Sequence, residues 1–320
     1  MKYRKLGRTG IEVSDIGLGT WAFGNNVYGG VAESDGINTI HAALDNGITL
    51  FDTAPQYGTK QQDGVAEIVL GKALINKRDK IAVQSKFGRN LTIENGAPQF
   101  YKERIIASVE ESLKRLQTDY LDVLFFHSPF YEGEIHDDVW EGVEKVVKDG
   151  KVRFIGHSIS EFPTTQHMAR RWAAEDKIDV IQVVISLMNR ESEQLIHDLS
   201  EYPIGIVARE CLANGFLAGV YDYDTKFKEG TLNARYSQEE LTERIDQVKA
   251  FEFLKKGSID HMAVAALRWV LDQKGVSTVL TGAKNIPELM GAVAASDAQS
   301  YSEDELAKAK ELLKKDFEAA

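Results

Sequence analysis

Four side chains in this sequence have types and a spacing that suit proton transfer. Asp52, Lys86 and His127 each stand at the end of a short apolar run, and Tyr57 follows Asp52 by five residues. A free tyrosine is a weak acid with a pKa of about 10, and a nearby lysine ammonium lowers that pKa. Asp52 would keep Lys86 charged, and His127 would hydrogen-bond a substrate oxygen or share its proton. The four residues therefore predict a proton-transfer site.

The same set contains no nucleophile and no electron source. Carbonyl reduction here would need a hydride donor bound as a cofactor. The seven histidines form no H-E-x-x-H motif and no C-x-x-C is present, so we expect no metal site. Lys86 as the Schiff-base nucleophile of an aldolase is an alternative. Asp52 and Tyr57 favour the reductase, because they favour a charged ammonium over a neutral amine.

Short apolar runs alternate with amphipathic segments along the whole chain. Most runs are continuous, as in parallel strands buried on both faces. The expected strands are Asp15–Leu18, Ile48–Phe51, Ile81–Gln84, Leu121–Phe126, Val152–Ile155, Val180–Val184, Gly205–Val207 and Ser277–Leu280. Gly47, Gly150 and Gly275 follow helical segments at positions where a helix C-cap needs a positive φ.

Eight such runs with interleaved helices predict an α/β protein, a single (β/α)8 TIM barrel spanning residues 1–320. An open doubly wound sheet is the alternative, but no G-x-G-x-x-G motif follows the first strand. Tyr3–Leu6 and Ile11–Ser14 predict an N-terminal β-hairpin, and Ser302–Phe317 predicts a C-terminal helix with Ser302 as its N-cap. The polar segment Gly219–Glu239 is expected to be a surface excursion after the seventh strand.

Composition excludes several classes of protein. The 320 residues are 43% hydrophobic and 27% charged, which is typical of a globular chain and not of a disordered, collagen-like or disulfide-rich one. The net charge of −11 disfavours nucleic-acid binding. A single cysteine, Cys211, excludes an internal disulfide and fits a reducing compartment. With no signal peptide or apolar span in view, we expect a cytoplasmic monomer or weak homo-oligomer without membrane partners.

Several motifs in order along the chain resemble those of the aldo-keto reductase family. The opening Tyr3–Gly10 with Gly17–Trp21 is similar to the family's start, and Phe51–Gly58 resembles its D-x-A-x-x-Y-G motif. Leu121–His127 resembles the fourth-strand signature, and Gly150–Gly156 resembles the G-K-[IV]-R-x-[IL]-G strand. Each motif is weak alone, but together they cover essentially the full length.

The resemblance implies Tyr57 as the general acid, tuned by Lys86 and Asp52, with His127 orienting the carbonyl. It also implies a nicotinamide cofactor, usually NADPH, and a small-molecule carbonyl or sugar as substrate. The residues that align with cofactor-binding positions are Gly19, Thr20, Trp21, Ser158, Gln182, Arg209, Gly282, Ala283, Lys284 and Glu288.

The sequence departs from the family in the half that would hold the cofactor. Ile159 stands where a carboxamide-binding asparagine is common, and Arg209 stands where an aromatic residue often stacks. Glu288 would repel a 2′-phosphate but could accept a hydrogen bond from a ribose hydroxyl, whereas Lys284 acts in the opposite direction. NADH is therefore an alternative cofactor. A cofactor-binding scaffold or sensor with little turnover is the alternative function.

Overall fold

Eight parallel strands close into a barrel in the computed structural model, which describes residues 1–25, 27–93 and 97–314. The barrel order is β10-β3-β4-β5-β6-β7-β8-β9, so the first and last strands in sequence pair to complete the ring. The strands are β3 (Ile16–Gly19), β4 (Leu50–Asp52), β5 (Ala82–Phe87), β6 (Leu121–His127), β7 (Val152–Ser158), β8 (Val180–Val184), β9 (Gly205–Arg209) and β10 (Val276–Thr281).

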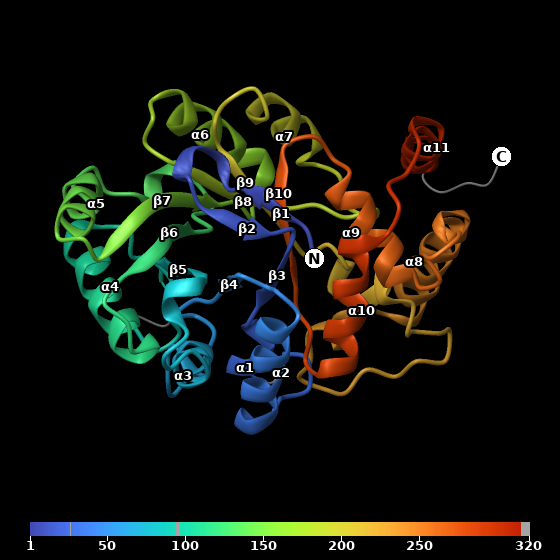
Figure 1. Cartoon of the computed structure of the whole chain (residues 1–320), viewed down its shortest axis with the longest axis horizontal. Coiled ribbons are helices and arrows are strands. Elements are labelled where there is room, and N and C mark those ends of the chain that lie inside the picture. The colour runs from blue at the N-terminus through green and yellow to red at the C-terminus, as the bar shows by residue number, and fades with distance from the viewer. Residues whose placement is uncertain (26, 94–96, 315–320) are drawn as a thin grey trace.

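Helices surround the strands on the outside (Figure 1). Their buried faces pack against the outer side of the barrel and form the larger apolar core. The helices are α1 (Trp21–Gly24), α2 (Glu33–Asp45), α3 (Val65–Ala73), α4 (Lys102–Leu116), α5 (Val139–Lys148), α6 (Phe162–Ala174), α7 (Glu193–Leu199), α8 (Gln238–Ala250), α9 (Met262–Leu271), α10 (Ile286–Asp297) and α11 (Glu303–Lys314).

An antiparallel hairpin of β1 (Tyr3–Lys5) and β2 (Glu12–Ser14) covers the end of the barrel at which the strands begin. Arg8 donates from Nε to Asp179 just before β8, at 2.8 Å, and Arg4 donates to the carbonyl of Val276 at the start of β10, also at 2.8 Å. Gly7 has a φ of 54° and lies so close to Gly205 that a Cβ would clash with its backbone. The open mouth is therefore at the opposite end.

The interior of the barrel is a second, smaller core. Its buried members come from the hairpin and from the inward positions of the strands: Leu6, Val13, Leu50, Ala82, Val123, Phe125, Val180, Val207 and Leu280. Packed side chains fill the barrel from the end that the hairpin covers, as in other TIM barrels. A substrate site can therefore form only at the opposite end of this core, where the strands end.

The sequence placed all eight strands and the hairpin correctly, and the TIM barrel is confirmed. Several strands run further than expected, so that Lys86 and His127 are the penultimate and last residues of β5 and β6. Gly47, Gly150 and Gly275 all have a positive φ, as predicted.

The segment Gly219–Glu239 follows the seventh barrel strand and is exposed or half-buried except at Asn233, so the expected surface excursion is confirmed. It contains a short 3-10 helix at Leu232–Arg235 and the start of α8. Ser302 caps the C-terminal helix through the backbone N–H of Glu305, as expected. Residues 315–317 of that predicted helix lie outside the described residues.

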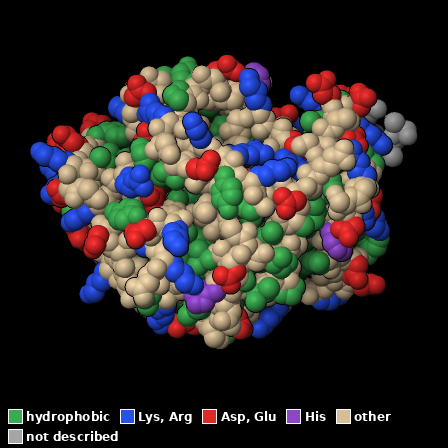
Figure 2. Space-filling model, viewed as in Figure 1, with side chains coloured by type: hydrophobic (Ala, Val, Ile, Leu, Met, Phe, Trp, Pro, Cys, Tyr) green, Lys and Arg blue, Asp and Glu red, His purple; other side chains and the backbone are tan. Residues whose placement is uncertain are grey.

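The described helices include none that is both long and apolar enough to cross a membrane. On the face shown in Figure 2, acidic and basic side chains are interspersed over the surface.

Candidate active site

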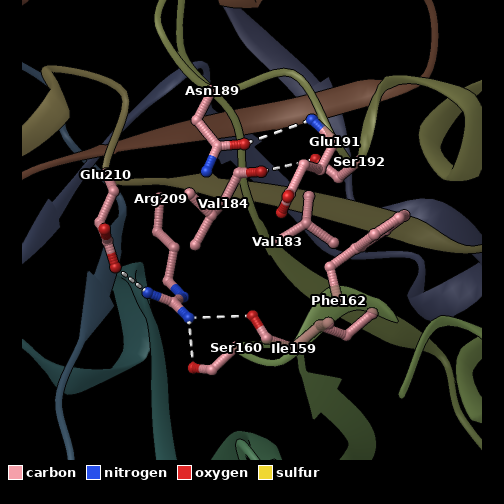
Figure 3. A pocket seen from close by; sticks show the side chains of 10 residues that line it. All are labelled: Ile159, Ser160, Phe162, Val183, Val184, Asn189, Glu191, Ser192, Arg209 and Glu210. Carbon is pink, nitrogen blue, oxygen red and sulfur yellow. Dashed lines mark hydrogen bonds and ion pairs between the residues drawn. The ribbon is translucent and has the colours of Figure 1, made fainter. Parts of the chain in front are cut away.

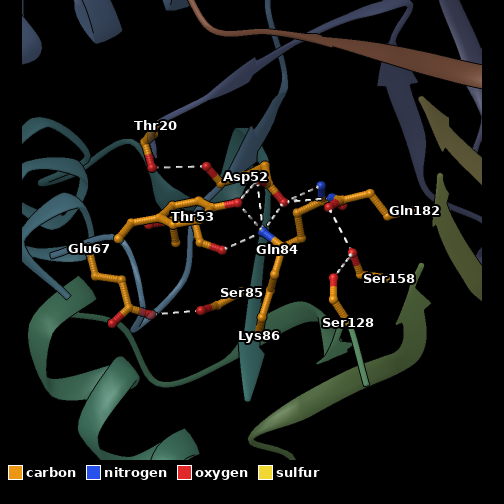
Figure 4. Close-up of polar contacts among 11 residues, drawn as sticks. Thr20, Asp52, Thr53, Glu67, Gln84, Ser85, Lys86, Ser128, Ser158 and Gln182 are labelled. Atoms are coloured by element: carbon orange, nitrogen blue, oxygen red, sulfur yellow. Dashed lines mark hydrogen bonds and ion pairs between the residues drawn. The ribbon is translucent and has the colours of Figure 1, made fainter. Parts of the chain in front are cut away.

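A buried ion pair between Lys86 and Asp52 lies at the centre of the barrel mouth (Figure 4). The Lys86 ammonium lies 2.7 and 2.8 Å from the two carboxylate oxygens and also donates to the carbonyl of Thr53 at 2.9 Å. Lys86 and Asp52 are only 1% and 3% exposed. Removing two charges from water is costly unless they are paired and well hydrogen-bonded. At these strand ends the two charges are paired with each other, and Lys86 makes a further hydrogen bond to a backbone carbonyl.

Two glutamine side chains also bind the same carboxylate. Gln84 and Gln182 donate to Asp52 Oδ1 at 2.9 and 2.8 Å. Gln84 is paired with Asp52 in the β4–β5 register and lies two residues before Lys86, so it points to the same face as the lysine. Gln84 is not among the residues predicted from the sequence. A polar residue at an inward position of a buried strand was the available signal.

Tyr57 completes the cluster from the loop after β4. Its hydroxyl accepts a hydrogen bond from Lys86 at 3.0 Å and donates to Asp52 Oδ2 at 3.4 Å. Burial raises the pKa of Tyr57 well above its ordinary value, the negative charge of Asp52 acts in the same direction, and Arg209 opposes both. The expectation that Lys86 lowers this pKa was therefore wrong in its net direction. Tyr57 carries its proton at neutral pH and can donate it.

The neighbouring cation and imidazole are also affected by burial. Burial lowers the pKa of Lys86, whereas Asp52 acts to raise it. Burial, Lys86 and Arg209 together hold the pKa of His127 well below its usual value, so the imidazole is neutral. The ring of His127 stands edge-on to that of Tyr57, with 6.0 Å between centroids. Within the described part of the chain, its Nδ1 is buried and has no hydrogen-bond partner.

Aromatic side chains from α1 and the segment that follows it stand beside Tyr57. Trp21 lies with its ring centroid 6.1 Å from that of Tyr57, and Tyr28 packs edge-on against Trp21 at 5.4 Å. Phe87 is fully buried and packs against Phe126 on the outer side of the strands. That position removes Phe87 from the mouth.

The residues aligned with carboxamide binding lie in one row across the strand ends. Ser158 is paired in register with Gln182, and its hydroxyl donates to Gln182 Oε1 at 3.3 Å. Ile159, the next residue, is only 2% exposed and has an apolar side chain. Ser158 and Gln182, and not Ile159, are therefore the residues of this row whose side chains can form hydrogen bonds with a ligand.

Arg209 reaches from the end of β9 across this row (Figure 3). Its guanidinium donates to the carbonyl of Ile159 at 2.9 Å and to Ser160 Oγ at 2.8 Å, and it pairs with Glu210. These residues line a hollow of about 190 Å³ together with side chains from β8 and the following loop. The guanidinium is therefore held in place before any ligand binds.

The remaining cofactor candidates differ in how accessible they are. Thr20 is fully buried, and its hydroxyl donates to the carbonyl of Asp52 at 2.9 Å, so its side chain supports the end of β4. Gly19 is half-buried and Gly282 is exposed, with open space where a Cβ would stand at Gly282. Ala283 is buried.

Lys284 and Glu288 lie at the start of α10. Glu288 accepts hydrogen bonds from the backbone N–H of Lys284 at 3.0 Å and from Asn285 Nδ2 at 3.1 Å. The Lys284 ammonium lies 3.6 Å from the same carboxylate, and the two side chains are 38% and 43% exposed. From the sequence, Lys284 and Glu288 were expected to act in opposite directions on a 2′-phosphate, whereas in the structure they form an ion pair.

Two further reactive residue types lie away from the mouth. His157 is buried behind the barrel wall and packs edge-on against Trp172 of α6, at 4.9 Å between centroids, and burial lowers its pKa to about 3. Cys211 is a buried free thiol whose pKa is raised by burial. The described residues contain no group of three or more His, Cys, Asp or Glu that could hold a metal ion.

Comparison with known proteins shows the family of the chain. The sequence model of the Aldo/keto reductase family matches residues 15–314. The chain is 34% identical to Aldo-keto reductase YhdN of Bacillus subtilis, over 90% of this chain and 87% of that protein. It is 30% identical to L-galactose dehydrogenase of Arabidopsis thaliana, over 92% and 88% of the two chains.

Solved structures give the same result. The glycerol dehydrogenase AKR11B4 from Gluconobacter oxydans superposes with a TM-score of 0.82 and 26% identity, over 99% of this chain and 97% of that chain. The chain belongs to the aldo-keto reductase family. It is an oxidoreductase of a family that uses nicotinamide cofactors and acts on small carbonyl substrates.

Proposed function

We propose that this protein reduces an aldehyde or ketone, or oxidises the matching alcohol, with Tyr57 as the general acid. The observation that carries the proposal is the position of the Tyr57 hydroxyl, 3.0 Å from the Lys86 ammonium. Burial and Asp52 keep this hydroxyl protonated by raising its pKa. The phenol therefore has a proton to give and a fixed cation beside the oxygen that would lose it.

A nicotinamide cofactor held at the barrel mouth would supply a hydride for the carbonyl carbon. Tyr57 gives its proton to the carbonyl oxygen, so that one hydride and one proton convert the carbonyl to an alcohol. The tyrosinate left behind lies against the Lys86 ammonium, which stabilises its negative charge. In the reverse direction the same tyrosinate takes the proton of the alcohol.

His127 orients the substrate in this proposal. Its imidazole is neutral because its pKa is held well below the usual value, and a neutral ring can donate one N–H to the carbonyl oxygen. A neutral histidine is a poor proton source, so the proton comes from Tyr57. The edge-on contact between the two rings supports this proposal, because both groups would then reach the same substrate oxygen.

The ends of β7, β8 and β9 fit a nicotinamide ring. Ser158 and Gln182 offer polar groups for its carboxamide. The guanidinium of Arg209, which is hydrogen-bonded to the Ile159 carbonyl, offers a flat surface beside them. Arginine can stack on planar rings. Ile159 adds no hydrogen bond from its side chain. Gly19, the last residue of β3, and Trp21, the first residue of α1, border the same mouth.

The adenosine end would lie near Gly282, Ala283, Lys284 and Glu288, at the start of α10. We propose NADPH as the cofactor and NADH as the alternative. Glu288 is bonded to its own helix start and paired with Lys284, which reduces its repulsion of a 2′-phosphate. Exposed pairs of this kind contribute little energy and can rearrange around a ligand.

For the substrate we propose a small carbonyl compound or sugar. The aromatic pair Trp21 and Tyr28 offers apolar faces, and Arg209 with Glu210 offers charged partners for hydroxyl groups. The names of two relatives, a glycerol dehydrogenase and an L-galactose dehydrogenase, point to polyols and sugars. We further propose one barrel domain over residues 1–320, acting as a monomer or weak homo-oligomer.

The test is a parallel titration of the purified protein with NADPH and NADH, followed by a panel of aldehydes, ketones and sugars. We expect binding of NADPH and cofactor-dependent reduction of at least one carbonyl. Binding without turnover of any panel member would instead support the alternative, a cofactor-binding scaffold or sensor. Failure of both cofactors to bind would overturn the proposed function.

A further inference from the structure

Asp52 receives more donors than its ion pair with Lys86 requires. Oδ1 accepts from Lys86 at 2.7 Å, from Gln84 at 2.9 Å and from Gln182 at 2.8 Å. Oδ2 accepts from Lys86 and, at a longer distance, from Tyr57. Because a carboxylate only accepts, the amide nitrogen of Gln84 must face it. Gln84 therefore donates a hydrogen bond to the same carboxylate whose negative charge acts on the Tyr57 hydroxyl.

Gln84 gains little else from this arrangement. The residue is fully buried, and Asp52 is its side-chain partner. Across the residues that the structure describes, Gln84 Oε1 is buried without a hydrogen bond. An unpaired buried carbonyl oxygen costs stability, which an apolar side chain at the same position would avoid. The glutamine is therefore better explained by its effect on Asp52 than by its contribution to folding.

We propose that Gln84 is a positioning residue that holds the Asp52 carboxylate toward Lys86 and limits its pull on the proton of Tyr57. This inference rests on the proposed function, because it concerns the same proton transfer. The ionisable groups around Tyr57 come from β4, β5, β6 and the end of β9, and they are Asp52, Lys86, His127, Arg209 and Glu210. All of them are left in place when Gln84 alone is changed.

Loss of the Gln84 donor has a defined direction. The carboxylate of Asp52 would share its charge with fewer donors, so its attraction for the Tyr57 proton would increase. The pKa of Tyr57 would rise further. We expect the pH profile to move toward higher pH by about half to one unit in both reaction directions, which is about a three- to tenfold loss of alcohol oxidation at a fixed pH.

The experiment uses Gln84→Met, which keeps the length of the side chain and removes the donor. The pH profiles of kcat/KM for reduction and oxidation are measured beside the melting temperature. We expect the profile to shift while the melting temperature is kept or raised. Gln84→Leu is the second variant, in case the methionine packs poorly. An unchanged profile in a folded variant would overturn the inference.

Gln99 provides a matched control. It is also a fully buried glutamine, and its amide atoms have no hydrogen-bond partner among the described residues. Gln99→Met should leave the pH profile unchanged. If it shifts the profile equally, the effect is a general one of losing a buried amide and the inference fails.

A second readout does not depend on turnover. The ring-carbon NMR signal of Tyr57, assigned by its loss in Tyr57→Phe, reports the hydrogen bonds of the hydroxyl near neutral pH. It should move in Gln84→Met and stay in place in Gln99→Met, even if no carbonyl substrate is found. Absence of turnover in the wild type would count against the proposed function, whereas an unmoved Tyr57 signal would count against the role of Gln84.

Discussion

The centre of the barrel mouth and the rim at the start of α10 both contain a lysine–carboxylate pair, but the two pairs are built differently. Lys86 and Asp52 are almost completely buried, with 2.7 Å between the charged atoms and further donors around them. Lys284 and Glu288 are well exposed and lie 3.6 Å apart.

The difference shows which part of the site is fixed and which can adapt. A buried pair is strongly coupled to its neighbours, and losing one partner leaves an uncompensated charge in the interior. An exposed pair is screened by water and contributes at most about 1 kcal/mol. The buried pair is therefore fixed in place, whereas a single substitution can retune the exposed pair, and with it the cofactor preference that we propose.

The largest effect is expected from Lys86→Met. Turnover should fall about a thousandfold or more, because the tyrosinate loses its cation. The free energy of unfolding should fall by about 3–5 kcal/mol, because Asp52 stays buried without its partner. Urea denaturation and steady-state kinetics measure the two effects. The double variant with Asp52→Asn should recover stability but not activity, and recovered activity would contradict the account.

The next largest effect is expected at His127. Replacing it with Phe should lower kcat about 100-fold, because one hydrogen-bond donor to the developing oxyanion is lost. The pKa of His127 lies well below its usual range, so the wild-type rate should show no transition from histidine protonation near pH 6 to 7. A transition in that range that disappears in His127→Phe would show that the imidazole titrates there after all.

A smaller effect concerns His157, which is buried behind the wall without a charged partner. Its pKa is about 3 in the folded chain and about 6.5 when unfolded, so the unfolded state binds the proton more readily. The contribution of neutral His157 to the free energy of unfolding should be fully present above about pH 6.5. It should decrease on acidification by at most about 1.4 kcal/mol per pH unit. His157→Phe should flatten that slope in chemical denaturation, and an unchanged slope would contradict it.

The smallest effect is expected at the rim. Glu288→Gln removes a carboxylate near the proposed 2′-phosphate position and should tighten NADPH binding relative to NADH by about threefold, within the range of an exposed pair. Parallel fluorescence titrations measure the ratio of dissociation constants. Lys284→Met should move the ratio in the opposite direction. A change of a hundredfold or more would mean that the rim is as tightly coupled as the centre.

Much of this architecture could be predicted from the sequence. Continuous apolar runs located the strands, and the rule that barrel sites lie at strand ends brought Asp52, Lys86 and His127 to one mouth. The direction of the Tyr57 pKa shift could not be predicted, because it depends on how deeply the hydroxyl is buried. The pairing of Lys284 with Glu288 depends on a local helix cap, and sequence spacing alone does not show which partner a flexible side chain selects.

Gln84 and Phe87, on opposite faces of one strand, also show how much of a side chain's surroundings can be predicted from the sequence. Both lie on β5, but one points to Asp52 and the other packs against Phe126. The alternation of side chains along a strand predicts that they face opposite ways, with Gln84 on the same face as Lys86. The partner of Gln84 depends on the register with β4, so its hydrogen bond to Asp52 became visible only in the structure.

The most direct test of the central claim compares wild type with Tyr57→Phe in a single turnover, with reduced cofactor bound first and a carbonyl substrate added. The two proteins should bind the cofactor about equally, because Phe keeps the ring and removes only the hydroxyl. The wild type should consume the cofactor, and the variant should be slower by about a hundredfold to ten-thousandfold, the usual contribution of a general acid. Consumption by the variant at the wild-type rate would contradict the account.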